Sequence, residues 1–176
     1  SINGNLSIGN NTSLSVGGVN FSVAGTTTVG SGSGGTLAIT SSTGTKAFTG
    51  VVSVSSSATW NNSGNSPVTF RGGITNNGTF TAGSGTYTFD SNTQSLNGTL
   101  TIPNIDVSGV TLINNNMLTV TTALNGSGDL TQTNGSTLTL SGTSGISTLN
   151  AINSGNAVIY DGSSQTIYPT TYFHLS

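Results

Sequence analysis

The chain has 176 residues, and only six of them carry a formal charge: two are Lys or Arg and four are Asp, beside one His and no Cys. An average soluble domain is about a quarter charged residues, so this chain lacks most of the groups that acid–base, metal and phosphate chemistry require. The net charge of −2 includes no cluster of Lys and Arg for nucleic acid or an anionic membrane. No apolar run approaches the roughly 20 residues of a membrane-spanning helix.

Pairs of apolar residues separated by one intervening residue recur along the whole chain. In chain order they lie at 6–8, 14–16, 21–23, 37–39, 52–54, 68–70, 87–89, 100–102, 118–120, 138–140 and 158–160. A period of two predicts strands with one buried and one solvent-facing side. Asn-Gly and Asp-Gly pairs between these segments favour turns. No helical spacing is present, so the sequence predicts an all-β protein.

The spacing of these pairs favours a coiled architecture. Two segments also repeat with one and the same offset: 76–81 matches 114–119, and 99–102 matches 137–140. That offset equals two coils of about 19 residues, a length typical of β-helix repeats. We therefore expect a right-handed parallel β-solenoid of about eight to nine coils. Residues 1–176 are expected to form a single block, one link of a longer repeat array or filament.

An Ig-like β-sandwich is the alternative fold, because it also combines short strands with frequent turns. A sandwich of this length normally has longer strands and some charge on its outer faces. The Cys–Trp–Cys pattern of Ig domains is absent, since the chain has no Cys and Trp60 is its only Trp.

The ionisable residues form no pattern typical of a catalytic site. His174 is not accompanied by a Gly-x-Ser-x-Gly motif. Asp90, Asp106 and Asp129 follow one another at steps close to one coil, so neighbouring coils can bring two of them together, but turn positions explain them equally well. We expect no enzyme activity, no cofactor and no metal site.

Two uncharged patterns are the main candidates for surface roles. Asn76, Asn77, Asn114 and Asn115 are expected to stack at matching turns and form a ladder of amide hydrogen bonds along the fibre axis. Thr99, Thr101, Thr137 and Thr139 each flank an apolar residue and are expected to form an outward Thr face. Such a face resembles the ice-binding surface of some antifreeze β-helices.

The segments 72–89 and 165–172 resemble the modules of large bacterial β-strand-repeat surface proteins, similar to filamentous-haemagglutinin-like and autotransporter-like adhesins. The resemblance covers nearly the whole chain, depends on composition as much as on motif, and carries no catalytic residues. It implies an extracellular β-solenoid present in tandem copies. The lack of Cys is compatible with a secreted surface protein without disulfides.

These observations predict a structural subunit of an extracellular bacterial surface fibre that assembles end to end with copies of itself. Tyr168, Tyr172, Phe173 and Leu175 form an aromatic-rich segment that we expect to make the junction. The alternatives are an adhesin that binds a carbohydrate or a host surface, and an ice-binding solenoid that uses the Thr rows. Neither nucleic acid nor membrane insertion is expected.

Overall fold

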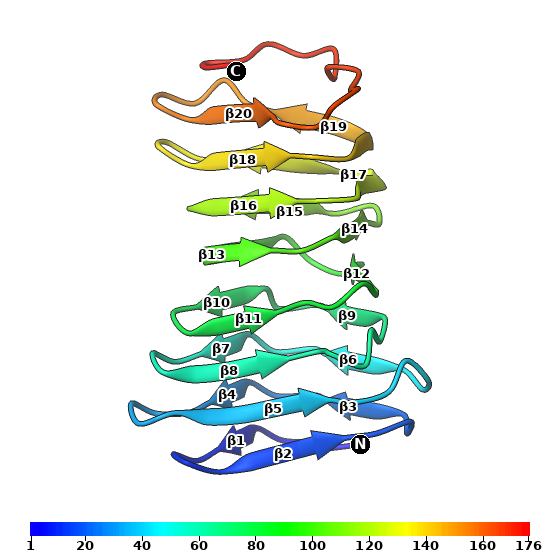
Figure 1. The fold of residues 1–176 in the computed structure, drawn as a ribbon, viewed down its shortest axis with the longest axis vertical. Coiled ribbons are helices and arrows are strands. Elements are labelled where there is room, and N and C mark those ends of the chain that lie inside the picture. The colour runs from blue at the N-terminus through cyan, green and yellow to red at the C-terminus, as the bar shows by residue number, and fades with distance from the viewer.

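The chain winds into a right-handed coil of strands that rises from the N-terminus to the C-terminus (Figure 1). The computed structural model describes residues 1–176, and it contains twenty strands and no helix. Neighbouring coils pair in parallel throughout. There are about eight coils of about 20 residues each, which confirms the predicted β-solenoid. A β-sandwich is excluded, because its sheets are antiparallel.

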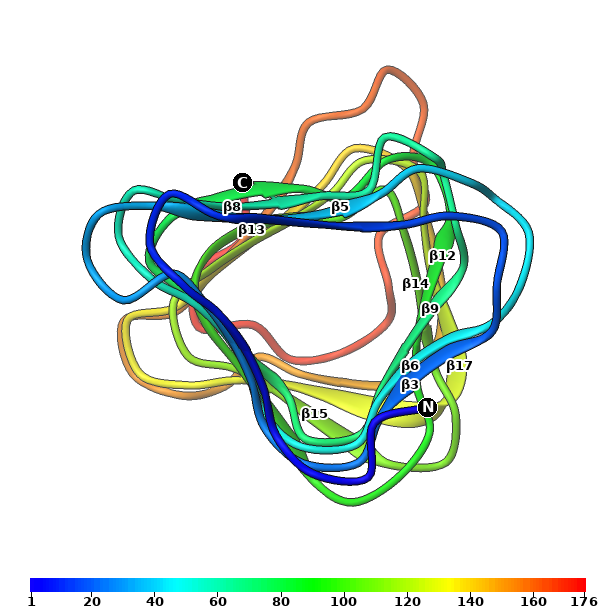
Figure 2. The same ribbon diagram turned by 90° about the horizontal axis from the view of Figure 1, so that it is seen from below.

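Each coil is a triangle, and each side of the triangle stacks on the same side of the next coil (Figure 2). The first face contains β1 (Leu6–Ile8), β4 (Thr27–Val29), β7 (Val52–Val54), β10 (Ile74–Asn76), β13 (Gln94–Thr101) and β15 (Thr111–Asn114). The second face contains β2 (Ser13–Val16), β5 (Gly35–Ile39), β8 (Ala58–Asn61), β11 (Thr79–Thr81), β16 (Met117–Val120), β18 (Thr137–Leu140) and β20 (Ala157–Tyr160). The third face contains β3 (Phe21–Val23), β6 (Lys46–Phe48), β9 (Val68–Phe70), β12 (Thr86–Phe89) and β14 (Asn104–Val107).

Three long strands bend around a corner and belong to two faces. The second half of β13 continues on the second face, where it pairs with β16. The strands β17 (Ala123–Gln132) and β19 (Thr143–Asn150) begin on the third face and end on the first. Glycine makes these bends possible: Gly98 within β13 has a φ of 87°, a conformation that residues with a Cβ rarely adopt.

The predicted alternation of buried and outward residues is confirmed. The distance in sequence between apolar pairs, however, equals a full coil at some positions and only part of a coil at others. Leu100, Leu118 and Leu138 lie directly above one another on the second face, so their spacing is the true coil length. The pairs at 37–39, 52–54 and 68–70 instead belong to β5, β7 and β9, which lie on three different faces. The shorter steps between these pairs therefore span two sides of the triangle and not a full coil.

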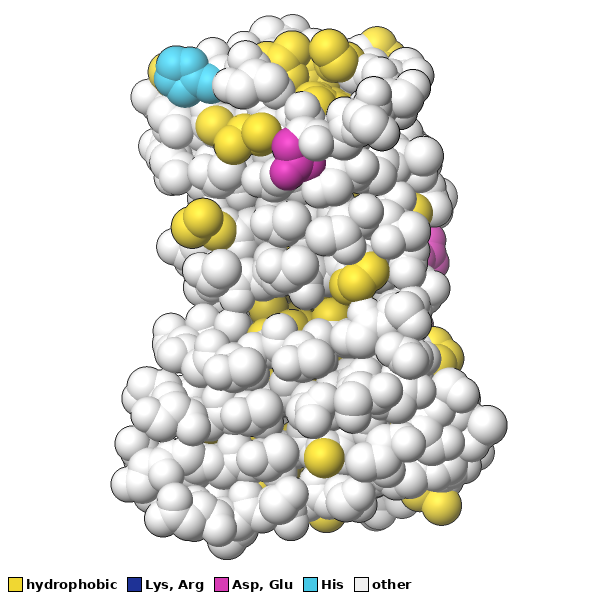
Figure 3. Space-filling model, viewed as in Figure 1, with side chains coloured by type: hydrophobic (Ala, Val, Ile, Leu, Met, Phe, Trp, Pro, Cys, Tyr) yellow, Lys and Arg dark blue, Asp and Glu magenta, His cyan; other side chains and the backbone are white.

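The core is one continuous cluster of 33 buried apolar residues, and its composition follows the width of the coils. On the third face one step of the coil leads from Val23 to Phe48 near the N-terminus, whereas the shorter step from Phe89 to Val107 completes a coil further along. The wide N-terminal coils hold most of the aromatic rings, and the narrower middle coils hold Leu, Ile and Val. Figure 3 shows the broad N-terminal part and the narrower middle of the molecule.

The second face is interrupted once, between β11 and the second half of β13. The strand β11 pairs with β8 only, and Thr99–Thr101 pairs with β16 only. On the first and third faces the same two coils remain joined, through β10 with β13 and through β12 with β14. We refer to this interruption as the seam; in Figure 1 it is the wide space between β11 and β13.

Candidate functional site

The ionisable side chains are scattered, and the one ion pair joins two neighbouring coils. The Nε and Nη2 atoms of Arg71 donate to the two carboxylate oxygens of Asp90 at 2.8 and 2.9 Å. This hydrogen bond lowers the pKa of Asp90 below its usual value and raises that of Arg71. Both side chains are partly exposed, so the pair contributes little to stability. It clasps two adjacent coils.

Lys46 is the most unusual charged residue, because it is buried without a carboxylate partner. Its Nζ donates to the backbone carbonyl oxygens of Val19 at 3.1 Å, Thr43 at 2.8 Å and Gly44 at 3.1 Å. Burial lowers its pKa. The three carbonyl dipoles stabilise the ammonium group, which ties the turn before β6 to the coil beneath it. This role is structural.

The acidic residues Asp106 and Asp129 lie on different faces of the coil. Asp106 lies on the third face between Thr88 and Asn125, and it accepts a hydrogen bond from Ser108 at 2.8 Å. Asp129 lies on the first face beside Thr111. No group of three His or Asp residues lies close enough together to hold a metal ion.

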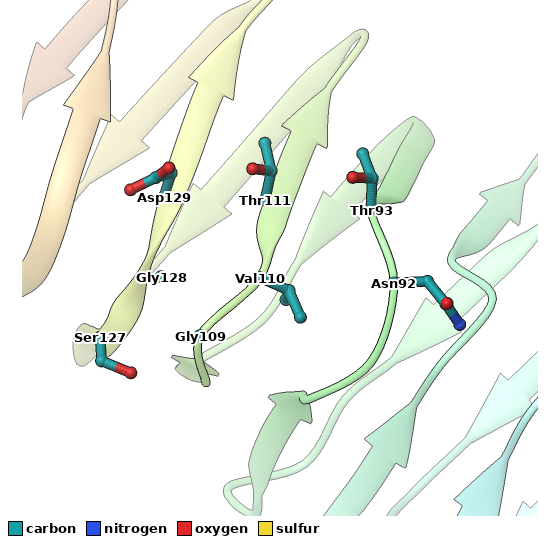
Figure 4. A pocket seen from close by; sticks show the side chains of 8 residues that line it. All are labelled: Asn92, Thr93, Gly109, Val110, Thr111, Ser127, Gly128 and Asp129. Atoms are coloured by element: carbon teal, nitrogen blue, oxygen red, sulfur yellow. The ribbon is translucent and has the colours of Figure 1, made fainter.

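One hollow of the surface lies beside Asp129, where residues of three successive coils meet (Figure 4). It has a volume of about 430 Å³ and is lined by Asn92, Thr93, Gly109, Val110, Thr111, Ser127, Gly128 and Asp129. Hydroxyl groups, an amide and one carboxylate can bind a neutral polar ligand, but they include no base–nucleophile pair.

The chain after β20, residues 161–176, folds over the last coil; we call this segment the tail. Ala151 of the last coil bridges to Tyr172, and Val158 bridges to Leu175. The hydroxyls of Tyr160 and Tyr172 lie 3.1 Å apart, and the backbone N–H of Tyr168 donates to the Tyr160 hydroxyl at 3.0 Å. The tail therefore closes the core with tyrosine rings.

The four residues predicted for the junction divide into two groups. Tyr168 and Tyr172 are half-buried and pack against the core, and burial raises the pKa of Tyr172. Phe173 and Leu175 are 45% and 43% exposed. Figure 3 shows hydrophobic atoms and the single histidine gathered at this end of the molecule. The structure thus leaves only Phe173 and Leu175 of the four available for contacts with another molecule.

The predicted Asn ladder is not formed by the four residues named for it. Asn76 and Asn114 are two coils apart, and each donates to a backbone carbonyl on the second face, that of Thr99 at 2.7 Å and that of Thr137 at 2.9 Å. Their matching geometry explains why the sequence around one resembles the sequence around the other. Two amide contacts do form along the axis, each with a residue outside the four: Asn114 Nδ2 donates to Gln132 Oε1 at 2.8 Å, and Asn115 Nδ2 donates to Asn97 Oδ1 at 2.9 Å.

The predicted Thr residues do lie on the outer surface of the second face, on either side of the buried Leu100 and Leu138. Thr101, Thr119 and Thr139 form one unbroken row. The neighbouring row is interrupted, because Met117 lies between Thr99 and Thr137. Ice binding by these rows stays a prediction.

Sequence reasoning missed the Arg71–Asp90 clasp and the seam. The clasp had a signal, because the two residues are about one coil apart in the sequence. The seam had none, since Thr79–Thr81 and Thr99–Thr101 have the same Thr-apolar-Thr pattern as strands that do pair.

The fold and surface together define a β-solenoid repeat protein with a neutral, hydroxyl- and amide-rich exterior. No known protein family, no curated protein and no solved structure matches this chain. A helix capable of crossing a membrane is not found in the structure.

Proposed function

We propose that this β-solenoid is a structural module of an extracellular bacterial surface fibre, in which copies join end to end by stacking strand on strand. The observation that carries the proposal is that the N-terminal end has open strand edges beside partly buried apolar side chains, while the tail at the C-terminal end exposes apolar side chains. Unpaired edges accept further strands, and each solenoid coil buries its apolar side chains against the next.

The N-terminal end offers the first of these surfaces. The strands β1 and β2 stand at the ends of their sheets, and β3 is followed only by the isolated bridge from Val23 to Ile2. Leu6, Leu14 and Phe21 pack against the core but are only partly buried. Their counterparts on the next coil, Thr27, Leu37 and Lys46, are at most 1% exposed. A further coil stacked beneath β1–β3 would bury the same positions here.

The C-terminal end offers the second surface. Phe173 and Leu175 are exposed there, together with Ile167 and Ile152. These four are the majority of the seven large apolar side chains that are exposed in the whole molecule. Burial of such side chains is the main driving force for association. The low charge of the chain also means that stacked copies repel each other weakly.

Electron microscopy of the purified chain tests the proposal. We expect thin filaments with an axial repeat of roughly 40 Å, from about eight coils at 4.8 Å each. The variant Phe173→Ser/Leu175→Ser should give monomers, because the exposed side chains of the junction are removed while the tyrosines that close the core remain. Met117→Ser is the matched control, since Met117 is 54% exposed on the side of the coil, and it should leave the filaments intact.

Monomeric wild-type particles across a range of concentrations would contradict the proposal. Filaments that persist in the Phe173→Ser/Leu175→Ser variant would show that the tail does not form the junction. Size-exclusion chromatography with light scattering measures both outcomes in solution.

A further inference from the structure

The seam is the only place where two strands that face each other on the same side of neighbouring coils do not pair. Above and below it the second face consists of two separate stacks, β2-β5-β8-β11 and β13-β16-β18-β20. The seam therefore presents two strand edges within the length of the coil, in addition to those at its ends. Unpaired edges are templates for pairing with another chain.

The backbone groups of the seam point toward each other across the open space. In a strand the N–H and C=O groups of successive residues point to opposite sides. The carbonyl of Thr81 accepts from Asn62 of the coil below, so the backbone groups of Phe80 point up into the seam. On the other side Ile102 donates to Thr119 of the coil above, so the backbone groups of Thr99 and Thr101 point down into it.

The seam is also a groove of about 580 Å³, lined by Asn76, Asn77, Gly78, Thr79, Phe80, Gly98, Thr99 and Thr101. Figure 3 shows this side of the molecule, with a hollow at mid-height in which hydrophobic atoms are visible. The ring of Phe80 is half-buried and stacks on Trp60 at 5.4 Å. The groove thus combines backbone donors and acceptors, small hydroxyl side chains and an apolar floor, and it contains no charge.

We propose that the seam binds an extended polypeptide strand of a partner protein by β-augmentation. Both edges run in the same direction, so an inserted strand can pair in parallel with β11 and with β13. Its central residue lies between Phe80 and Leu100 and must be apolar. The residues on either side lie between pairs of Thr and must be small and uncharged. The ligand is therefore a neutral Thr-apolar-Thr type of strand, recognised chiefly through its backbone.

Insertion requires the two edges to stand about 10 Å apart, twice the usual distance between strands. The first and third faces keep the two coils joined, so insertion would have to open the coils on the second face alone, with the other two faces as the hinge. The hydrogen bond from Asn76 to the carbonyl of Thr99 is the side-chain bond that spans the seam. It holds the corner end of the groove and leaves the end near Thr81 and Thr101 free to open.

A matched pair of proline variants tests whether the seam is open in solution. Thr101 and Thr119 are stacked on each other, but the N–H of Thr101 points into the seam and that of Thr119 points into the ladder. Thr101→Pro removes a donor without a ladder partner and should change the melting temperature by less than about 3 °C, whereas Thr119→Pro should lower it by about 6 °C or more. Equal losses would mean that the seam is closed, which overturns the proposal.

Binding is tested with a fluorescein-labelled peptide, blocked at both ends, that copies residues 135–142 (Gly-Ser-Thr-Leu-Thr-Leu-Ser-Gly). We expect saturable binding by fluorescence anisotropy that falls about tenfold or more in Thr101→Pro. Ser15→Pro is the control, because it blocks the open edge of β2 at the end of the same face, and it should leave binding unchanged.

Three outcomes would overturn the proposal: no binding to the wild type, loss of binding in Ser15→Pro with retention in Thr101→Pro, or binding of a neutral oligosaccharide in place of the peptide. The filament assay is independent of these results, because the seam lies in the middle of the coil and the proposed junctions lie at its ends.

Discussion

At the scale of single residues, the most constrained polar group is the hydroxyl of Tyr87. It accepts from Trp60 Nε1 at 3.2 Å and from Asn62 Nδ2 at 3.1 Å, and it donates to the carbonyl of Ala82 at 2.9 Å. The residue is fully buried. One oxygen atom thus joins β8 and β12 to the residues that directly follow β8 and β11.

The Tyr87→Phe variant should lower the free energy of unfolding by about 1–3 kcal/mol at neutral pH, because it leaves buried partners unsatisfied. The pH dependence gives a second test. Burial raises the pKa of Tyr87 to about 12 from its ordinary value of 10.0. The folded state therefore retains a proton that the unfolded state loses, and stability should fall by about 2–3 kcal/mol as the pH rises from 10 through 12.

Urea unfolding of the wild type and of Tyr87→Phe between pH 7 and 12 measures both effects. The variant should lose part of the alkaline dependence, and the remainder is expected from Tyr172, whose pKa is also raised. Identical slopes for the two proteins would contradict this account. Between pH 5 and 9 we expect little change in either protein, because the chain has so few groups that titrate there.

The role of a polar residue can be predicted from the sequence only where its partner is another side chain. The clasp between Arg71 and Asp90 follows from the coil length, because opposite charges one coil apart can stack. The environment of Lys46 does not follow from any spacing, since its partners are three backbone carbonyls. Sequence similarity matches Asn76 with Asn114 correctly, yet the two side chains bind carbonyls and not each other.

At the scale of strands, the corner inside β13 depends on a single glycine. A Cβ at Gly98 would overlap the carbonyl oxygen of Asn76, and the φ of Gly98 is positive. Both the close approach and the backbone conformation exclude other residues. Gly4, in contrast, has no atom of a neighbouring coil within 4 Å of the place that a Cβ would occupy, and its φ is ordinary.

Gly98→Ala should therefore destabilise the protein by about 2–4 kcal/mol, whereas Gly4→Ala should change stability by less than about 1 kcal/mol. Thermal unfolding monitored by circular dichroism distinguishes the two. A small loss for Gly98→Ala would mean that β13 can shift away from β10 at this corner, and that the seam is wider in solution than in the structure.

The predicted pairs leave out several strands, and two of these, β11 and β17, are poor in alternating apolar residues. The strand β11 contains a single apolar residue, Phe80, and β17 contains three glycine or alanine residues within its first six positions. Such segments become strands because the coils above and below provide backbone partners, and this information is not local. The assignment of strands to faces is missed for the same reason.

At the scale of the whole molecule, the number of coils is predictable because it depends on the mean spacing of apolar residues, but the taper is not. The stacked residues Phe48, Phe70, Phe89 and Val107 show how the length of a coil and the size of its buried side chain change together. The step in sequence from one member of this column to the next becomes shorter toward Val107. A shorter perimeter encloses less area, so smaller side chains fill it.

This relation predicts that side-chain size is matched to position and not only to burial. Phe70→Val leaves a cavity in a wide coil and should cost about 2–4 kcal/mol, and Val107→Phe overpacks a narrow coil and should cost about 1–3 kcal/mol. Both residues are fully buried. The exchange variant that carries both substitutions keeps the composition of the chain unchanged, which makes it a control for hydrophobicity itself.

Phe70 and Val107 are two coils apart, about 10 Å, and Phe89 lies between them and stacks on both. In guanidinium unfolding the exchange variant should lose a free energy of the order of the two single losses together, about 3–7 kcal/mol, changed by the coupling of the two sites through Phe89. A loss below about 1 kcal/mol would show that the core adapts to any apolar content of the right total volume. The observed grading from aromatic to aliphatic would then not determine the taper of the coil, and the backbone turns alone would have to set it.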